Sequence, residues 1–189
     1  MCEYPKTITL SRSSGQEKEF LIRRCTEADL LDVTKLQLKV YEGLPDPGLY
    51  APLEEEFVRE SLLEDYCFGA YSEGRLAGFT MMVANRVSDR NYGSYVGYSE
   101  ERQKKCVTME LSIVDSEFRG YGLQKLFVAI REEEARRAGA TEALVSVAPD
   151  NEYSLANLIN SGYVIIDTRP LHEGEIRHIL SKNLNENKS

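Results

Sequence analysis

The chain has 189 residues, of which 42% are hydrophobic and 29% charged, a balance typical of a folded domain rather than a disordered chain. Its net charge of −8 argues against nucleic acid as a partner, because a phosphate backbone is held by a basic surface. The sequence shows no apolar run of about 18 residues and no secretory pattern at its start, so we expect a cytoplasmic protein without a membrane span.

Hydrophobic periodicity predicts strands and helices in the first half of the chain. Thr26 is a residue type that caps helices, and apolar residues at helical spacing follow it as far as about Tyr41. A polar turn around Gly74, between two apolar segments, indicates a β-hairpin. The expected elements are strands at 6–10 and 20–23, helices at 26–41 and 53–64, and hairpin strands at 66–71 and 76–83.

Residues 85–105 are polar, rich in tyrosine and poorly periodic, which predicts a long loop that is either functional or mobile. Tyr92, Tyr95 and Tyr98 are expected either to line a substrate pocket or to anchor this loop. The elements expected after it are strands at 106–114 and 142–148, helices at 122–138 and 151–160, strands at 163–167 and 176–180, and a polar tail at 181–189.

The order of these elements predicts the fold class. Hairpins early in the chain give antiparallel pairs, and the later alternation of strands and helices is typical of a mixed sheet. We therefore expect an α/β protein with a central, partly antiparallel sheet and helices on both faces. One domain is expected over residues 1–189, with its core at about 20–180.

A glycine-rich turn joins the strand at 106–114 to the helix that follows. Gly120 and Gly122 remove side chains, so a ligand can approach the backbone closely, and Arg119 adds a fixed positive charge. The first turn of the helix adds backbone N–H groups that have no partner within the helix. Together these features predict an anion site suited to a pyrophosphate. The alternative, that the two glycines only end a strand and start a helix, does not explain the adjacent arginine.

The segment Arg119-Gly120-Tyr121-Gly122-Leu123-Gln124 resembles the acetyl-CoA signature of the GNAT superfamily of N-acetyltransferases, R/Q-x-x-G-x-G/A. Gln124 departs from the pattern, which has Gly or Ala at the last position. A second block, Val147 to Ser154 followed by Gly162-Tyr163, resembles the family's next conserved segment. The resemblance covers about residues 20–180 and implies a GNAT-like fold with acetyl-CoA as cosubstrate.

The same resemblance implies which residues contact acetyl-CoA. Backbone groups of the strand would pair with the pantetheine arm, and the turn would hold the pyrophosphate. Asn151 would bond to the arm or the phosphates with help from Asn157, although Asn151 could equally be a helix cap. The residues assigned to the cosubstrate in this way are Ile113, Val114, Arg119, Gly120, Tyr121, Gly122, Leu123, Gln124, Asn151 and Asn157.

Acyl transfer to an amine requires a base, because an alkyl amine is protonated at pH 7. Glu110 is our candidate, because it shares a strand face with Ser112 and because several family members carry an acid at this spacing. Other members place the base where this chain has Cys106, and Glu110 could instead be a paired carboxylate of the sheet. Many family members have a tyrosine as the general acid at the position that Leu158 occupies in this chain. The leaving thiolate would then be protonated by Tyr153, by Tyr163 or by solvent.

No metal is expected, because His172 and His178 lack ligand spacing, and the four scattered cysteines are expected to be reduced thiols. The acceptor is expected to be a primary amine, with net acidity favouring a small cationic one. Two alternatives stay open: an acyl-CoA sensor without turnover, and acetylation of a protein or peptide N-terminus. The preferred acyl chain and the oligomeric state, including a homodimer, also stay open.

Overall fold

The structure is a computed structural model that describes residues 4–50, 52–171 and 174–185. The chain divides into two compact units. The first unit holds residues 1–47, 51–81 and 111–129, and the second holds residues 48–50, 82–110 and 130–189. Two strands and a long helix run from one unit into the other: β4 (Arg75–Val83), β5 (Cys106–Val114) and α5 (Leu123–Arg137). The expectation of a single domain over 1–189 stays a prediction.

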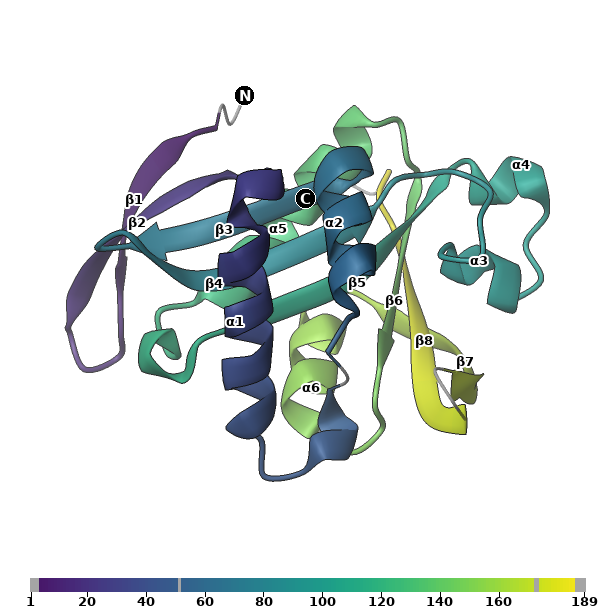
Figure 1. Ribbon diagram of the computed structural model, residues 1–189. Helices are drawn as coiled ribbons and strands as arrows, with labels where there is room; N and C mark the ends of the chain where they lie inside the picture. Colours follow the sequence, from purple (N-terminus) through teal and green to yellow (C-terminus); the bar gives the residue numbers. More distant parts are fainter. Residues whose placement is uncertain (1–3, 51, 172–173, 186–189) are drawn as a thin grey trace. The chain divides into compact units, whose positions relative to one another are not determined.

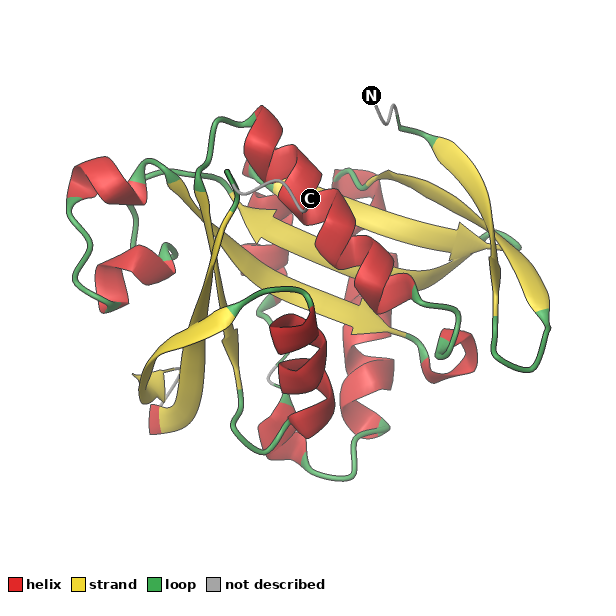
Figure 2. Cartoon of the chain, turned by 180° about the vertical axis from the view of Figure 1, so that it is seen from behind, coloured by secondary structure: helices red, strands yellow, loops and turns green. Residues whose placement is uncertain are grey.

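The first unit is built from hairpins covered by helices. Within it, α1 and α2 lie on one face of the strands, and the first half of α5 lies on the other (Figures 1 and 2). Its other elements are β1 (Lys6–Ser11), β2 (Glu17–Arg24), α1 (Leu30–Glu42), α2 (Glu55–Glu64), β3 (Tyr66–Ser72) and the single-turn helix η3 (Ser116–Phe118). Thr26 forms a capping box with Asp29 at the start of the short 3-10 helix η1 (Glu27–Asp29), which leads directly into α1 at Leu30. The helix start predicted at Thr26 is therefore confirmed, with one 3-10 turn before the α-helix.

The second unit contains the segment between β4 and β5 and the C-terminal hairpin. Its elements, besides the parts shared with the first unit, are α3 (Tyr92–Tyr95), α4 (Glu100–Gln103), β6 (Glu142–Val147), α6 (Glu152–Asn160), β7 (Val164–Leu171) and β8 (Glu175–Asn183). The prediction of an unstructured loop over 85–105 was wrong in part, because α3 and α4 form within it, each with a side-chain N-cap.

The strands form one eight-stranded sheet in the order β1-β2-β3-β4-β5-β6-β8-β7. The pairs β1–β2, β2–β3, β6–β8 and β7–β8 are antiparallel, while β5–β6 is parallel. This arrangement confirms the predicted mixed, partly antiparallel α/β fold.

Close packing at Gly78 sets the position of α5 against the sheet of the first unit. A Cβ atom at Gly78 would lie 2.9 Å from Cε2 of Phe127 and 3.1 Å from the carbonyl oxygen of Ile113. Both distances are too short for an ordinary contact, so a residue without a side chain is needed where α5 crosses β4. Phe127 and Leu123 are 0% and 2% exposed, so the apolar face of this helix is buried.

The C-terminal strand is longer than the sequence predicted. It was expected over 176–180, but β8 extends to Asn183, and Leu184 beyond it is 2% exposed. The ladder with β6 explains this extension, because it continues to the pair Glu142↔Asn183. Of the expected polar tail, residues 186–189 lie outside the described residues.

Candidate active site

The turn after β5 has a backbone shape that requires its two glycines. Gly120 and Gly122 have φ angles of +86° and +81°, in the left-handed region that other residues avoid. Arg119 before them is extended, with φ −67° and ψ 152°. A Cβ atom at Gly122 would meet nothing within 4 Å, so the space beside this backbone is open.

Tyr121 faces inward between these two glycines. Its side chain is 3% exposed, and its ring lies 5.5 Å from the ring of Phe20 on β2. Tyr121 therefore anchors the turn to the core, and what it can offer a ligand is its backbone. Leu123, 2% exposed, is also a core residue.

Three backbone amides at the start of α5 have no acceptor within the helix. The first bond from helix to turn runs from the amide of Leu126 to the carbonyl of Gly122, at 3.0 Å. The amides of Leu123, Gln124 and Lys125 precede it, and in a helix such amides point outward from the N-terminus. With the exposed Arg119 beside them, these donors form a positive end suited to an anion.

Arg12, in the β1–β2 connection, binds the main chain of this turn. No pattern in the sequence identified it as a site residue. Its Nε atom donates to the carbonyl oxygen of Arg119 at 3.0 Å, and its Nη2 atom donates to the carbonyl oxygen of Glu117. Its guanidinium also lies 4.4 Å above the centre of the Tyr121 ring. One side chain thus fixes both the entrance and the middle of the turn.

We expect Arg12→Lys to lower the free energy of unfolding by about 1 kcal/mol, because lysine keeps the charge but cannot make both main-chain bonds in one plane. Urea denaturation measures this change. Lys18→Met is the control: Lys18 is on the same hairpin, 5.2 Å above the Phe118 ring, and contacts the exposed Glu73. Equal losses in the two variants would contradict the role of the guanidinium.

A cluster of charges fixes the start of the turn. Asp115, which is 3% exposed, accepts a bond from Lys39 Nζ at 2.8 Å and one from the amide of Glu117 at 3.0 Å. Glu117 also pairs with Lys39 at 2.9 Å and with Arg75 at 3.0 Å, and these cations lower the pKa of its carboxyl. The segment that leads into the glycine turn is therefore held by α1 and β4.

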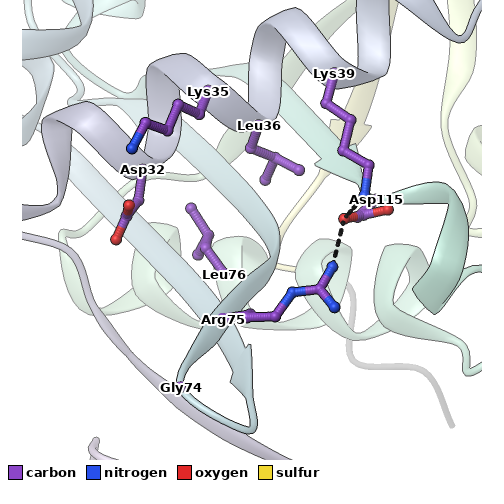
Figure 3. Close-up of a pocket in the computed structure, with 8 residues that line it drawn as sticks. All are labelled: Asp32, Lys35, Leu36, Lys39, Gly74, Arg75, Leu76 and Asp115. Carbon is purple, nitrogen blue, oxygen red and sulfur yellow. Dashed lines mark hydrogen bonds and ion pairs between the residues drawn. The ribbon is translucent and has the colours of Figure 1, made fainter.

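A hollow of about 270 Å³ opens beside this cluster. Figure 3 shows Lys39 and Arg75 reaching Asp115 from opposite sides of the hollow. The residues that line it are Asp32, Lys35, Leu36, Lys39, Gly74, Arg75, Leu76 and Asp115. None of them belongs to the glycine turn, and two of the three cations already pair with acids, so we interpret the hollow as a surface groove.

Gln124, which departs from the family signature, packs back onto β5. Its Oε1 atom accepts a bond from the hydroxyl of Ser112 at 2.7 Å, and its Nε2 atom donates to the carbonyl of Ser112 at 3.2 Å. These two bonds tie the first turn of α5 to the strand. Ile113 and Val114, 4% and 5% exposed, follow Ser112 on β5 and can offer a ligand only backbone groups.

Glu110 lies in the second unit, where β5 leaves its partner strand. The β5–β6 ladder comprises Cys106↔Glu142, Val107↔Ala143 and Thr108↔Leu144, and Glu110 follows its last pair by two residues. The side chain is half-buried, and its Oε1 atom lies 3.4 Å from the phenolic oxygen of Tyr92. The carboxylate is therefore reachable and has a defined neighbour.

Cys106, at the alternative base position, is unsuited to take a proton at neutral pH. It is 0% exposed, its Sγ atom donates to Glu142 at 3.4 Å, and burial raises the pKa of its thiol to about 12. Cys25 and Cys67 are also buried, whereas Cys2 lies outside the described residues. This favours Glu110 among the two candidates.

The predicted contacts of the second signature block are all in the second unit. Asn151 caps α6, since its Oδ1 atom accepts a bond from the amide of Ser154 at 3.1 Å. Asn157, six residues after Asn151, lies half-buried in the same helix, and Leu158 beside it is 6% exposed. Of the substitute acids, Tyr153 is 74% exposed, whereas Tyr163 is 2% exposed and burial raises its pKa.

The tyrosines of the segment at 85–105 differ in role. Tyr92 is 3% exposed, and the hydroxyl of Tyr98 donates to Glu142 at 2.8 Å, so both anchor the segment. Tyr95 is 40% exposed.

The described residues contain no group of three or more His, Cys, Asp or Glu arranged to hold a metal ion. His178 contacts the hydroxyl of Thr168 at 2.8 Å, and His172 lies outside the described residues. Over the same part of the chain, no helix combines the length and the apolar character that crossing a bilayer requires.

Comparison with known families gives one match, to the model described as the Acetyltransferase (GNAT) family, over residues 30–158. No curated relative matches the chain at a significant level. The matched range includes β5, the glycine turn, α5 and most of α6.

Solved structures give the same fold. The structure of yncA from Salmonella typhimurium, with its cofactor acetyl-CoA, aligns with a TM-score of 0.65 and 16% identity over 90% of this chain and 96% of that one. The ribosomal-protein-S18-alanine N-acetyltransferase from Escherichia coli aligns with a TM-score of 0.66 and 15% identity over 90% and 97%. A GNAT-family acetyltransferase from Listeria monocytogenes aligns with a TM-score of 0.68 and 15% identity over 93% and 99%.

Proposed function

Because the chain belongs to the GNAT family of acetyltransferases, we propose that it transfers the acetyl group of acetyl-CoA to a primary amine. The observation that carries the proposal is the turn after β5, where two left-handed glycines expose backbone amides and Arg119 at the start of α5. The structural neighbour from Salmonella typhimurium, which has acetyl-CoA as its cofactor, supports the choice of acyl donor.

The residues of the turn fit a pyrophosphate. The open space beside Gly122 admits a phosphate oxygen, and the amides of residues 123–125 and the guanidinium of Arg119 supply donors. Ile113 and Val114 would bond to the pantetheine arm through backbone groups, as a short added strand. Asn157 would help to bind the arm or the phosphates. Asn151 keeps its cap and would add a contact through its remaining amide group.

The thioester supplies an acyl carbon that an amine can attack. The acceptor nitrogen forms the new C–N bond, the C–S bond breaks, and coenzyme A leaves as a thiolate. Glu110 takes the proton that the ammonium group must lose, directly or through one water molecule. The nitrogen releases its second proton to solvent as the amide forms, and the thiolate takes a proton from solvent, because Leu158 replaces the family's usual acid and Tyr163 is buried.

A small cationic amine is our first candidate acceptor, because the chain carries a net charge of −8. A protein N-terminus is the second candidate, since one structural neighbour is an alanine N-acetyltransferase of a ribosomal protein. A third reading, acyl-CoA binding without turnover, is supported by the missing tyrosine at position 158.

A titration combined with an amine panel tests the proposal. We expect acetyl-CoA to bind in calorimetry, and free CoA to appear only when a suitable amine is added. The panel should contain polyamines, an aminoglycoside, lysine, neutral amines and peptides with a free N-terminus. Binding without amine-dependent release of CoA would favour the sensor, and failure of acetyl-CoA to bind would overturn the proposal.

A further inference from the structure

Three side chains of the second unit meet where β5 and β6 stop pairing. Thr108↔Leu144 is the last pair of their ladder, and Glu110 on β5 and Ser146 on β6 each follow it by two residues. Because side chains alternate along a strand, both face the same side of the sheet as that last pair. The hydroxyl of Ser146 donates to the phenolic oxygen of Tyr92 at 3.1 Å, and that oxygen lies 3.4 Å from Glu110 Oε1.

Tyr92 is fixed in this place by its own segment. Its amide donates to Thr108 Oγ1 at 3.0 Å, and its ring packs in a buried cluster with Cys106 and Leu144. Asn91 caps α3 and donates to the carbonyls of Arg86 and Gln103 at 2.8 and 3.0 Å. The phenol therefore has little freedom to turn away from Glu110.

Burial raises the pKa of Tyr92 well above its ordinary value, and the charge of Glu110 adds to the effect. The phenol thus stays protonated over the working pH range and can donate to the carboxylate. Titratable or charged groups near this pair include Tyr95 in α3, Cys106 on β5 and Arg131 in α5. Burial lowers the pKa of Arg131, while nearby acidic groups, Glu110 among them, raise it.

We propose that Tyr92 is a positioning residue for the base Glu110, with Ser146 orienting its hydroxyl, so that the carboxylate is held ionised and aimed for proton removal. The inference rests on the proposed function, because it assigns Tyr92 a role only through Glu110. The 3.4 Å separation is long for an O–H···O bond, and such bonds commonly shorten when a substrate is in place.

The test is the pH profile of kcat/KM for Tyr92→Phe, which removes only the hydroxyl and keeps the ring in its cluster. A hydrogen bond to the charged form favours ionisation, so its loss should move the acid limb to higher pH, by about one pH unit. We therefore expect about tenfold lower kcat/KM on the acid limb, a small change at high pH, and an unchanged KM for acetyl-CoA. Ser146→Ala should shift the limb in the same direction by less.

Tyr95→Phe is the matched control, since Tyr95 lies in the same short helix with its ring 6.1 Å from that of Tyr92. It should leave the position of the acid limb unchanged, and thermal melts of all variants check that the fold is intact. If the acid limb did not shift in Tyr92→Phe while Glu110→Gln was strongly impaired, the positioning role of Tyr92 would be overturned. The assignment of Glu110 as the base would still stand. If Glu110→Gln were as active as the wild type, the base assignment and this inference would both fail, while acetyl-CoA binding would still stand.

Discussion

Glu110→Gln is expected to lower kcat by about 10²- to 10⁴-fold at pH 7, the range typical of losing a general base. Glutamine keeps the size of the side chain and its place beside Tyr92 but cannot accept the ammonium proton. The deficit should shrink as the pH rises toward the pKa of the free amine, about 10 for an alkyl amine, because the nucleophile then loses its proton unaided. Initial rates between pH 6 and 10 with one defined amine measure both effects.

Glu19→Gln is the control for this substitution, because Glu19 is an exposed strand carboxylate in the first unit. It should leave kcat and its pH dependence unchanged. The dissociation constant for acetyl-CoA should be the same in both variants, since neither substitution changes the glycine turn. An unaltered kcat in Glu110→Gln would remove Glu110 as the base.

Gly122→Ala is expected to weaken acetyl-CoA binding by about tenfold or more. Alanine at φ +81° is strained by roughly 1–2 kcal/mol. If the backbone shifts to relieve this strain, the amides at the start of α5 no longer point toward the pyrophosphate. No atom would clash with the new Cβ, so the fold should persist. Calorimetric titration with acetyl-CoA gives the affinity, and denaturation gives the loss of stability.

Gly139→Ala provides the matched control at the opposite end of α5. Gly139 has φ +77°, and a Cβ atom there would also meet nothing within 4 Å. The same strain should therefore lower stability to a similar degree and leave the affinity for acetyl-CoA unchanged. If both variants bound acetyl-CoA like the wild type, the turn would not be the pyrophosphate site.

Local signals in the sequence predicted most of the fold. The strand at 106–114 and the hairpin around Gly74 were found because apolar runs between turn residues depend on few distant contacts. The ends of elements were predicted less well. The last residues of β8 are an example, because they form a strand through pairing with β6 and not because of a hydrophobic pattern of their own. The short helices at 92–95 and 100–103 were missed because one helical turn leaves no periodic signal.

The candidate site was predictable where it is contiguous in the chain. The turn at 119–124 combines glycines, an arginine and a helix start in one segment, so a motif identifies it. The Tyr92–Glu110 contact and the bonds of Arg12 to the turn join residues far apart in the chain, and no local pattern encodes such contacts. Arg12 also precedes residues 30–158, the range that the family model matches.

The bonds from Arg12 to the glycine turn join segments that are 105 and 107 residues apart. Closing so long a loop costs conformational entropy, and contacts of this range are typically made after local hairpins and helices have formed. The turn can therefore reach its final shape only once the N-terminal hairpin has docked in the folding protein. Affinity for a phosphate group thus belongs to the assembled tertiary structure, and a short peptide spanning the motif would not reproduce it.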